Sequence, residues 1–215
     1  ATGKPAGICG IWNPDGWPEP ELGWVVFDGF EGKGVAYEAV DTSLLHGEQR
    51  AAEYVARNPQ GFVPMLEVGD LRLTQSLAII DWLDTTYAEP RLIPADAAAR
   101  STELAKAMVI AADIHPINNL RILKYLKNEL GQAQAEIDQW ARHWIIEGFT
   151  ALEAMANPAK PFLSGDVPGL ADVFLVPQMA NARRVATPLD AFPTLVAIDA
   201  RATALEPFAR AHPDA

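Results

Sequence analysis

The sequence has little of what marks a secreted, metal-binding or membrane protein. Cys9 is the single cysteine among 215 residues, so the chain can form no internal disulfide and no cysteine-rich metal site. No apolar run approaches the ~20 residues that a membrane-spanning helix needs, and we see no basic stretch leading into an apolar one, as in a secretory signal. We therefore expect a cytoplasmic protein without membrane segments.

Positive charge is also scarce. The chain has 17 Lys and Arg against 28 Asp and Glu, which gives a net charge of −11 and a pI near 4.7. Such a balance offers no electrostatic footprint for nucleic acid or an anionic membrane. The four histidines are scattered without the spacing of metal ligands, so we expect no metal site; they are His46, His115, His143 and His212.

The first 34 residues lack serine and arginine entirely, and Thr2 is their one hydroxyl residue. They hold eight of the fifteen glycines and four prolines. Residues 13–16 read as a turn, and residues 24–27 are compatible with either a short strand or a helix core. No helical periodicity is evident in this segment.

Short strands and helices alternate from residue 35 onward, which predicts an α/β half. The expected strands are 37–40, 62–68 and 71–73, and the expected helices are 48–57 and 77–83. Gly69 and Asp70 form a two-residue hairpin turn between two of these strands. Pro64 cannot donate to a sheet ladder and must lie at an edge or strand start, where a cis bond is plausible. Ser76 is expected to cap the following helix.

A proline-punctuated linker at 88–96 separates this half from a second half that reads as helical throughout. The predicted domains are 1–87 and 97–215, joined by that linker. The expected helices cover residues 97–115, 116–130, 134–156, 170–186 and 194–209, with breaks at prolines and glycines.

One helical stretch of the second half carries an unusual polar set. Ile110, Ile114 and Ile117 begin an apolar stripe with helical spacing, and Pro116 should bend the helix. His115, Asn118, Asn119 and Arg121 are spaced to share one side. This set suits a pocket for a small anionic ligand, but a core histidine and a surface arginine on a plain helix fit the pattern equally well.

Several motifs together resemble the glutathione transferases, and most closely the zeta class with the bacterial maleylpyruvate and maleylacetoacetate isomerases. They are Asn58-Pro59-Gln60-Gly61, Val63-Pro64, Gln75-Ser76-Leu77-Ala78-Ile79-Ile80, His115-Pro116-Ile117-Asn118-Asn119, Gly165-Asp166, Leu170-Ala171-Asp172 and Asn181-Ala182-Arg183-Arg184. The resemblance runs from about residue 33 to the end. It implies a thioredoxin-like α/β domain followed by an all-α domain, an active site in the cleft between them, and a homodimer.

The resemblance assigns roles residue by residue. Pro64 matches the family's cis-proline, which presents the backbone of Val63 to the cysteinyl part of glutathione as a strand partner. Gln75 and Ser76 match the residues that hold the γ-glutamyl carboxylate at a helix N-terminus, and Gln49 a position that helps hold the peptide; for Ser76 alone, an ordinary helix cap is the alternative.

In the helical half the family binds small dicarboxylates that have a cis double bond. Asn119, Arg121 and Arg184 match its amide and arginines at the pocket, and His115 would shape or polarise the site. Arginine suits the forked geometry of carboxylates. For Arg183 and Arg184 the alternative is a solvated pair at a helix end, and of the two we assign Arg184 to the pocket.

Two positions depart from the family pattern. The serine-rich stretch that acidifies the glutathione thiol falls on residues 20–23, which hold no hydroxyl, and the arginines after it are also absent. Cys9 lies too far upstream to replace it, so no catalytic residue is assigned. Gly169 stands where the family has a capping Ser or Thr, a change that should cost a few tenths of a kcal/mol.

The implied function is glutathione-dependent cis–trans isomerisation of maleylpyruvate or maleylacetoacetate in aromatic-compound breakdown. The alternatives are a general glutathione transferase or dehalogenase and a non-catalytic glutathione-binding protein. The N-terminal segment could form a rebuilt thiol site, belong to a binding-only descendant, or not represent the natural protein. Sequence alone leaves all three open.

Overall fold

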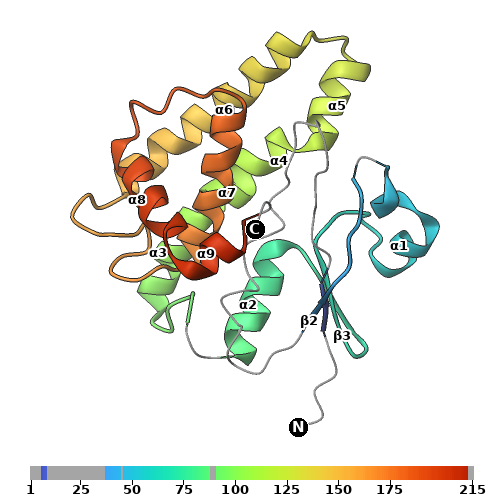
Figure 1. Ribbon diagram of the computed structural model, residues 1–215, viewed down its shortest axis with the longest axis horizontal. Helices are drawn as coiled ribbons and strands as arrows, with labels where there is room; N and C mark the ends of the chain where they lie inside the picture. Colours follow the sequence, from blue (N-terminus) through green and yellow to red (C-terminus); the bar gives the residue numbers. More distant parts are fainter. Residues whose placement is uncertain (1–5, 9–36, 45, 88–90, 213–215) are drawn as a thin grey trace. The chain divides into compact units, whose positions relative to one another are not determined.

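The computed structural model describes residues 6–8, 37–44, 46–87 and 91–212 (Figure 1). The chain divides into two compact units, one made of the residues up to Arg91 with the segment from Pro207, and the other of Leu92–Glu206. The predictions for residues 13–16, 20–23 and 24–27 and for Cys9 lie outside the described residues.

The first unit contains a small mixed sheet with strand order β2-β1-β3-β4. Its strands are β1 (Ala6–Ile8), β2 (Tyr37–Ala39), β3 (Met65–Val68) and β4 (Leu71–Thr74). β1 runs parallel to β2 and antiparallel to β3, and β3 pairs with β4 through the predicted hairpin at Gly69 and Asp70. β3 begins at Met65 instead of residue 62, which agrees with the inability of Pro64 to donate to the ladder.

Three helical segments accompany the sheet: the 3₁₀ turn η2 (Glu48–Arg50), α1 (Ala52–Arg57) and α2 (Ser76–Thr86). The single helix predicted over 48–57 was wrong, because Ala51 has an extended backbone and separates η2 from α1. The predicted cap of α2 was also wrong by one residue. Gln75 is the N-cap and Ser76 is the first helical residue. α2 buries Ile79, Ile80 and Leu83.

The second unit is helical in every regular element that the structure describes between residues 92 and 206. Its helices are α3 (Ala97–Met108), the π-helix η3 (Val109–Ile114), α4 (His115–Asn118), α5 (Leu120–Asn128), α6 (Gln134–Met155), α7 (Leu170–Arg184) and α8 (Pro193–Thr203). α7 is the central helix, since Leu170 to Met179 are all buried; it packs against α3 and α8. The helix predicted over 194–209 is interrupted between α8 and α9 (Glu206–Arg210).

The bend predicted at Pro116 takes a different form. Pro116 lies inside α4, the wider π-helical turns of η3 come before it, and the chain leaves helical geometry at Asn119. A proline lacks the N–H for an intrahelical bond and its ring crowds the carbonyl four residues earlier, so a π-helical stretch just before Pro116 relieves both problems. Asn118 faces α6 instead of solvent: it is buried, and its Nδ2 donates to the carbonyl of Ala141 at 3.3 Å.

The start of α7 is held by two buried carboxylates. Asp172 accepts from the backbone N–H groups of Leu163, Ser164 and Gly169 at 2.7, 3.1 and 3.0 Å. Glu103 accepts from the N–H of Ala171 at 2.7 Å and from the Ser164 hydroxyl at 2.5 Å. A Cβ at Gly169 would lie 2.6 Å from the Ser164 Oγ and 2.8 Å from the Glu103 Oε1. Glu103 therefore takes the role of a capping hydroxyl, and glycine leaves room for it.

Candidate functional site

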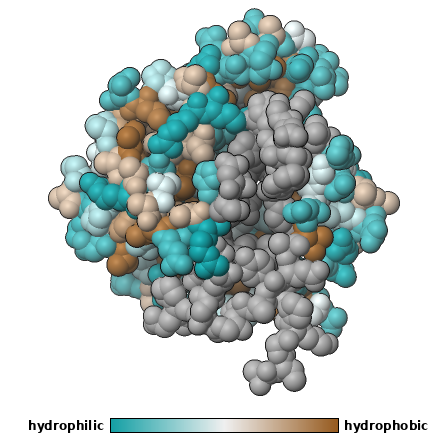
Figure 2. All heavy atoms as spheres, viewed as in Figure 1, coloured by the Kyte–Doolittle hydropathy of each residue, from teal (hydrophilic) through white to brown (hydrophobic). Residues whose placement is uncertain are grey.

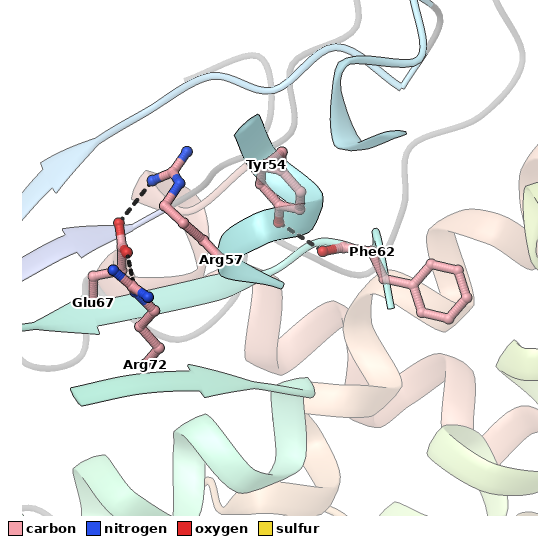
Figure 3. Close-up of polar contacts among 5 residues, drawn as sticks. All are labelled: Tyr54, Arg57, Phe62, Glu67 and Arg72. Atoms are coloured by element: carbon pink, nitrogen blue, oxygen red, sulfur yellow. Dashed lines mark hydrogen bonds and ion pairs between the residues drawn. The ribbon is translucent and has the colours of Figure 1, made fainter. Parts of the chain in front are cut away.

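Hydrogen bonds from α1 and its C-cap residue hold the loop that carries Val63. The Tyr54 hydroxyl donates to the carbonyl of Phe62 at 2.6 Å (Figure 3). The Asn58 Nδ2 donates to the same carbonyl at 2.7 Å. The Val63–Pro64 peptide bond is cis, as the sequence suggested. The backbone N–H and C=O of Val63 bond to no other described residue. Within the described part of the chain, these groups have the form that an extended peptide would pair with.

An ion-pair group ties α1 to the hairpin of β3 and β4. Glu67 accepts from Arg57 at 2.8 Å and from Arg72 at 2.9 Å, and Figure 3 shows its carboxylate lying between the two guanidinium groups. Pairs as exposed as these contribute roughly 0–1 kcal/mol each. Their effect here is to fix the hairpin against the helix that holds the Val63 loop.

The N-terminus of α2 is free of side-chain caps. Gln75 has a left-handed φ of 71° and makes no capping bond, and the first turn contains no acidic residue. The Gln75 Nε2 donates instead to the Gln60 Oε1 at 2.9 Å. The first N–H groups and the positive end of the helix dipole can thus receive an anion, with the half-buried Ser76 hydroxyl beside them.

Gln49 lies close to the same loop. A Cβ on Gly61 would come 2.9 Å from the Gln49 carbonyl oxygen. The Gln49 Oε1 is buried and has no hydrogen-bond partner among the residues that the structure describes. A buried amide oxygen without a donor is costly, so a ligand N–H at this position would be stabilising.

In the second unit, His115 and Arg121 interact although α4 and α5 are separate helices. Burial lowers the pKa of His115 to about 4, and the positive charge of Arg121 acts in the same direction. His115 is therefore neutral at pH 7 and can exchange hydrogen bonds with a ligand without adding charge. The Asn119 Oδ1 accepts from the N–H of Arg121 at 3.1 Å and caps α5, which leaves the Asn119 NH₂ group for a ligand.

The surface around this end of the second unit is polar. Arg121, Lys124 and Lys127 of α5 are exposed, whereas Leu123 and Leu126 turn inward. Figure 2 shows mainly hydrophilic residues over the region of α5 and the start of α6. In a chain with a net charge of −11, α5 is a local source of positive potential.

The two adjacent arginines at the end of α7 have different environments. Arg183 donates to Asp199 at 2.5 Å, and the Asp199 side chain is 3% exposed. Burial raises the pKa of Asp199 and the Arg183 pair opposes that rise. Arg184 is half-buried. Because Arg183 already neutralises a buried carboxylate, Arg184 is the better candidate for an incoming one.

Sequence reasoning missed the roles of Tyr54 and Asn58. Asn58 belongs to one of the family motifs, but no pattern indicates that its amide and a tyrosine four residues earlier bind one carbonyl. Across the parts of the chain that the structure describes, no group of three His, Cys, Asp or Glu side chains could hold a metal ion. Within the same residues, no helix is long and apolar enough to cross a membrane.

Comparison with known proteins matches residues 23–85 to the N-terminal domain of glutathione S-transferases. A probable maleylacetoacetate isomerase of Vibrio cholerae is 49% identical over 185 residues, which cover 85% of this chain and 86% of the relative. The holo structure of a bacterial zeta-class maleyl pyruvate isomerase is 38% identical, with a TM-score of 0.87 and 96% of both chains covered. This chain belongs to the zeta class of glutathione S-transferases.

The predicted fold class of this zeta-class transferase, a thioredoxin-like α/β domain with an all-α domain, is confirmed. A maleylacetoacetate isomerase of Anaeromyxobacter dehalogenans is 35% identical, with a TM-score of 0.81 over 98% of this chain and 91% of the other. That structure holds dicarboxyethyl glutathione and citrate in its active site.

The state of His115 should make stability depend on pH. Its pKa of about 4 in the folded state lies below the 6.5 of an unperturbed histidine, so the unfolded chain binds an extra proton between these values. The contribution of neutral His115 to the free energy of unfolding is therefore fully present above pH 6.5. It is lost as the pH drops toward 4, by about 3 kcal/mol at most. Urea unfolding of wild type and His115→Gln at pH 7 and 4.5 measures this, and the variant should lose less stability. His143→Gln, at an exposed histidine, is the control; equal losses in all three proteins would contradict the prediction.

Proposed function

We propose that this protein is a glutathione-dependent cis–trans isomerase of maleylpyruvate or maleylacetoacetate. One observation carries the proposal: over most of its length the chain is similar to isomerases of these two compounds, at 49% identity for the first relative. A related structure with a dicarboxyethyl adduct of glutathione supports the pairing of a thiol cofactor with a diacid.

The first unit would bind glutathione. The backbone N–H and C=O of Val63 would pair with the cysteinyl part of the tripeptide, in the geometry given by Pro64. The uncapped start of α2 at Gln75 and Ser76 would receive the γ-glutamyl carboxylate, and the buried Gln49 Oε1 would accept a peptide N–H.

The second unit would bind the diacid. Arg121 and Arg184 would each hold a carboxylate through paired N–H donors, and the Asn119 amide would add a neutral donor. His115, neutral at pH 7 because of its lowered pKa, would polarise the substrate carbonyl or enol. With His115 neutral, Arg121 and Arg184 would supply two positive charges, which match the two carboxylates of the substrate.

The reaction would use the cofactor as a borrowed nucleophile. The glutathione thiolate adds to one alkene carbon and moves the π electrons toward the conjugated carbonyl. The bond between the former alkene carbons is then single and rotates. Reversal of the addition expels the thiolate and restores the double bond in the trans form. Arg121, Arg184 and His115 would hold the charge of the intermediate, and no residue is assigned to thiol activation.

A glutathione titration tests the cofactor site. Ser76→Ala and Gln75→Ala should each raise the Kd for reduced glutathione by about 10-fold, because each removes a bond to a charged carboxylate. Calorimetry gives the Kd, and turnover with and without glutathione shows whether the thiol is needed. Ser101→Ala and Gln132→Ala, at exposed positions of the second unit, are matched controls. Unchanged Kd values in the Ser76 and Gln75 variants would remove these residues from the site.

A non-catalytic glutathione-binding protein is the second candidate, favoured by the absence of serine and arginine from residues 1–34. Saturable glutathione binding without turnover of either substrate, and without dehalogenation of chloroacetate-type acids, would establish it. The homodimer, the cytoplasmic location and the domain limits 1–87, 88–96 and 97–215 stay predictions.

A further inference from the structure

Gly148, in the middle of α6, leaves space that the side chain of Ile114 fills. A Cβ at this position would overlap the Cδ1 and Cγ1 atoms of Ile114. Glycine inside a helix costs about 1 kcal/mol relative to alanine, so α6 gives up helical stability at this point. What it gains is close contact with η3, whose last residue is the fully buried Ile114.

The short helix α4 is attached to α6 at both of its ends. Before its first residue, Ile114 fills the gap over Gly148. At its other end, Asn118 donates to the Ala141 carbonyl at 3.3 Å and the Ile117 carbonyl accepts from the Trp140 Nε1 at 3.1 Å. Ala141 and Gly148 are seven residues apart, which places them on one face of α6 two turns from each other.

This attachment determines where His115 lies. His115 directly follows Ile114, and α4 is too short to take up a displacement at one end without moving throughout. The chain after α4 leads through Asn119 into Arg121, so a change in the depth of α4 on α6 reaches each polar residue of the candidate diacid site in this segment. Both ends of η3 face Gly148, since a Cβ there would overlap Ile114 and lie 3.5 Å from the Val109 Cγ1.

We propose that Gly148 is a positioning residue, which sets the depth of α4 on α6 and so places His115 and Arg121 for a small diacid. The inference rests on the proposed function and deepens it: affinity for the second substrate depends on a residue of α6 that carries no side chain. The contacts of Ile114, Ile117 and Asn118 act with it as one attachment.

The test is Gly148→Ala. The added methyl should push Ile114 and α4 outward, raise the KM for maleylpyruvate by about 10-fold or more, and leave the Kd for reduced glutathione within twofold. NMR titration of the His115 imidazole, assigned with His115→Gln, should show its pKa moving toward 6.5. Gly148→Ala combined with Ile114→Ala removes both overlapping atoms and should recover at least part of the KM change.

A milder pair keeps the test decisive if Gly148→Ala does not fold. Ile114→Val and Ile198→Val each remove one methylene from a fully buried isoleucine of the second unit. Ile114→Val should change the KM several-fold and shift the His115 resonances, whereas Ile198→Val in α8 should change neither.

Unaltered His115 resonances and KM in both Gly148→Ala and Ile114→Val would overturn the inference. Equal losses in glutathione affinity and KM would overturn it as well, because they indicate a general loss of structure. Absence of turnover in the wild type would contradict the proposed function instead, and the His115 titration would still decide the role of Gly148.

Discussion

Arg184→Ala and Arg121→Ala are each expected to lower kcat/KM for maleylpyruvate by about 10²- to 10³-fold, mainly through a higher KM. Each guanidinium would form a charge-assisted, two-pronged contact with a carboxylate. Truncating one partner of such a contact costs 2–5 kcal/mol, since it leaves a desolvated charge without its partner. Steady-state kinetics at saturating glutathione provides the measurement.

Arg183→Ala is the matched control, because it removes the same side chain one residue away. It should leave kcat/KM within a few-fold, yet destabilise the fold by about 2 kcal/mol because the buried Asp199 loses its cation. The reverse pattern, with loss of turnover in Arg183→Ala and normal kinetics in Arg184→Ala, would show that the two roles are exchanged. Normal KM values in both Arg121→Ala and Arg184→Ala would remove the diacid clamp.

Asp172→Ala should lower the free energy of unfolding by about 3–5 kcal/mol, the largest effect on stability that we expect. The buried carboxylate accepts three backbone N–H groups, from Leu163, Ser164 and Gly169. Two buried donors and the partly buried N–H of Ser164 would lose their acceptor, and each buried group left so costs about 1–3 kcal/mol. Equilibrium unfolding in urea at pH 7 measures the change.

Asp166→Ala controls for the loss of a negative charge in the same region. Its carboxylate is 76% exposed and pairs with Lys160 at 2.6 Å, so its removal should cost less than about 1 kcal/mol. Similar destabilisation by both variants would argue against the special role of Asp172. A large loss of turnover in Asp172→Ala that persists when the protein is fully folded would argue for a direct part in catalysis.

The architecture was largely predictable because its signals are local. A hairpin turn at Gly69 and Asp70 and apolar periodicity in the long helices depend on neighbouring residues. The combination of short motifs supplied the rest, including the cis bond before Pro64.

The errors arose where tertiary packing overrides local preference. Residues 48–57 have helical character, yet Ala51 is extended in the structure. Ser76 is a better N-cap than glutamine by composition, but Gln75 takes the cap position with a positive φ. Ile114, the last residue of the π-helix before Pro116, packs over Gly148 in α6, a residue that sequence periodicity does not connect to it.

The roles of the candidate site residues stay predictions, and the structure adds contacts of these residues that the sequence does not show. The sequence does not separate Arg183 from Arg184, whereas the structure pairs Arg183 with Asp199 on a different helix. The lowered pKa of His115 likewise depends on burial and on the approach of Arg121. Contacts of this kind form between different helices, so the spacing of residues along the sequence does not predict them.

The two hydrogen bonds from Tyr54 and Asn58 to the Phe62 carbonyl bear on how this protein could be re-engineered. A mutant library restricted to ligand-contacting positions would treat α1 as inert scaffold. If Val63 binds the cofactor as proposed, substitutions in α1 would alter that binding, because Tyr54 of α1 and Asn58 at its C-cap hold the Phe62 carbonyl next to Val63. Selection for altered cofactor preference would do well to sample that helix too.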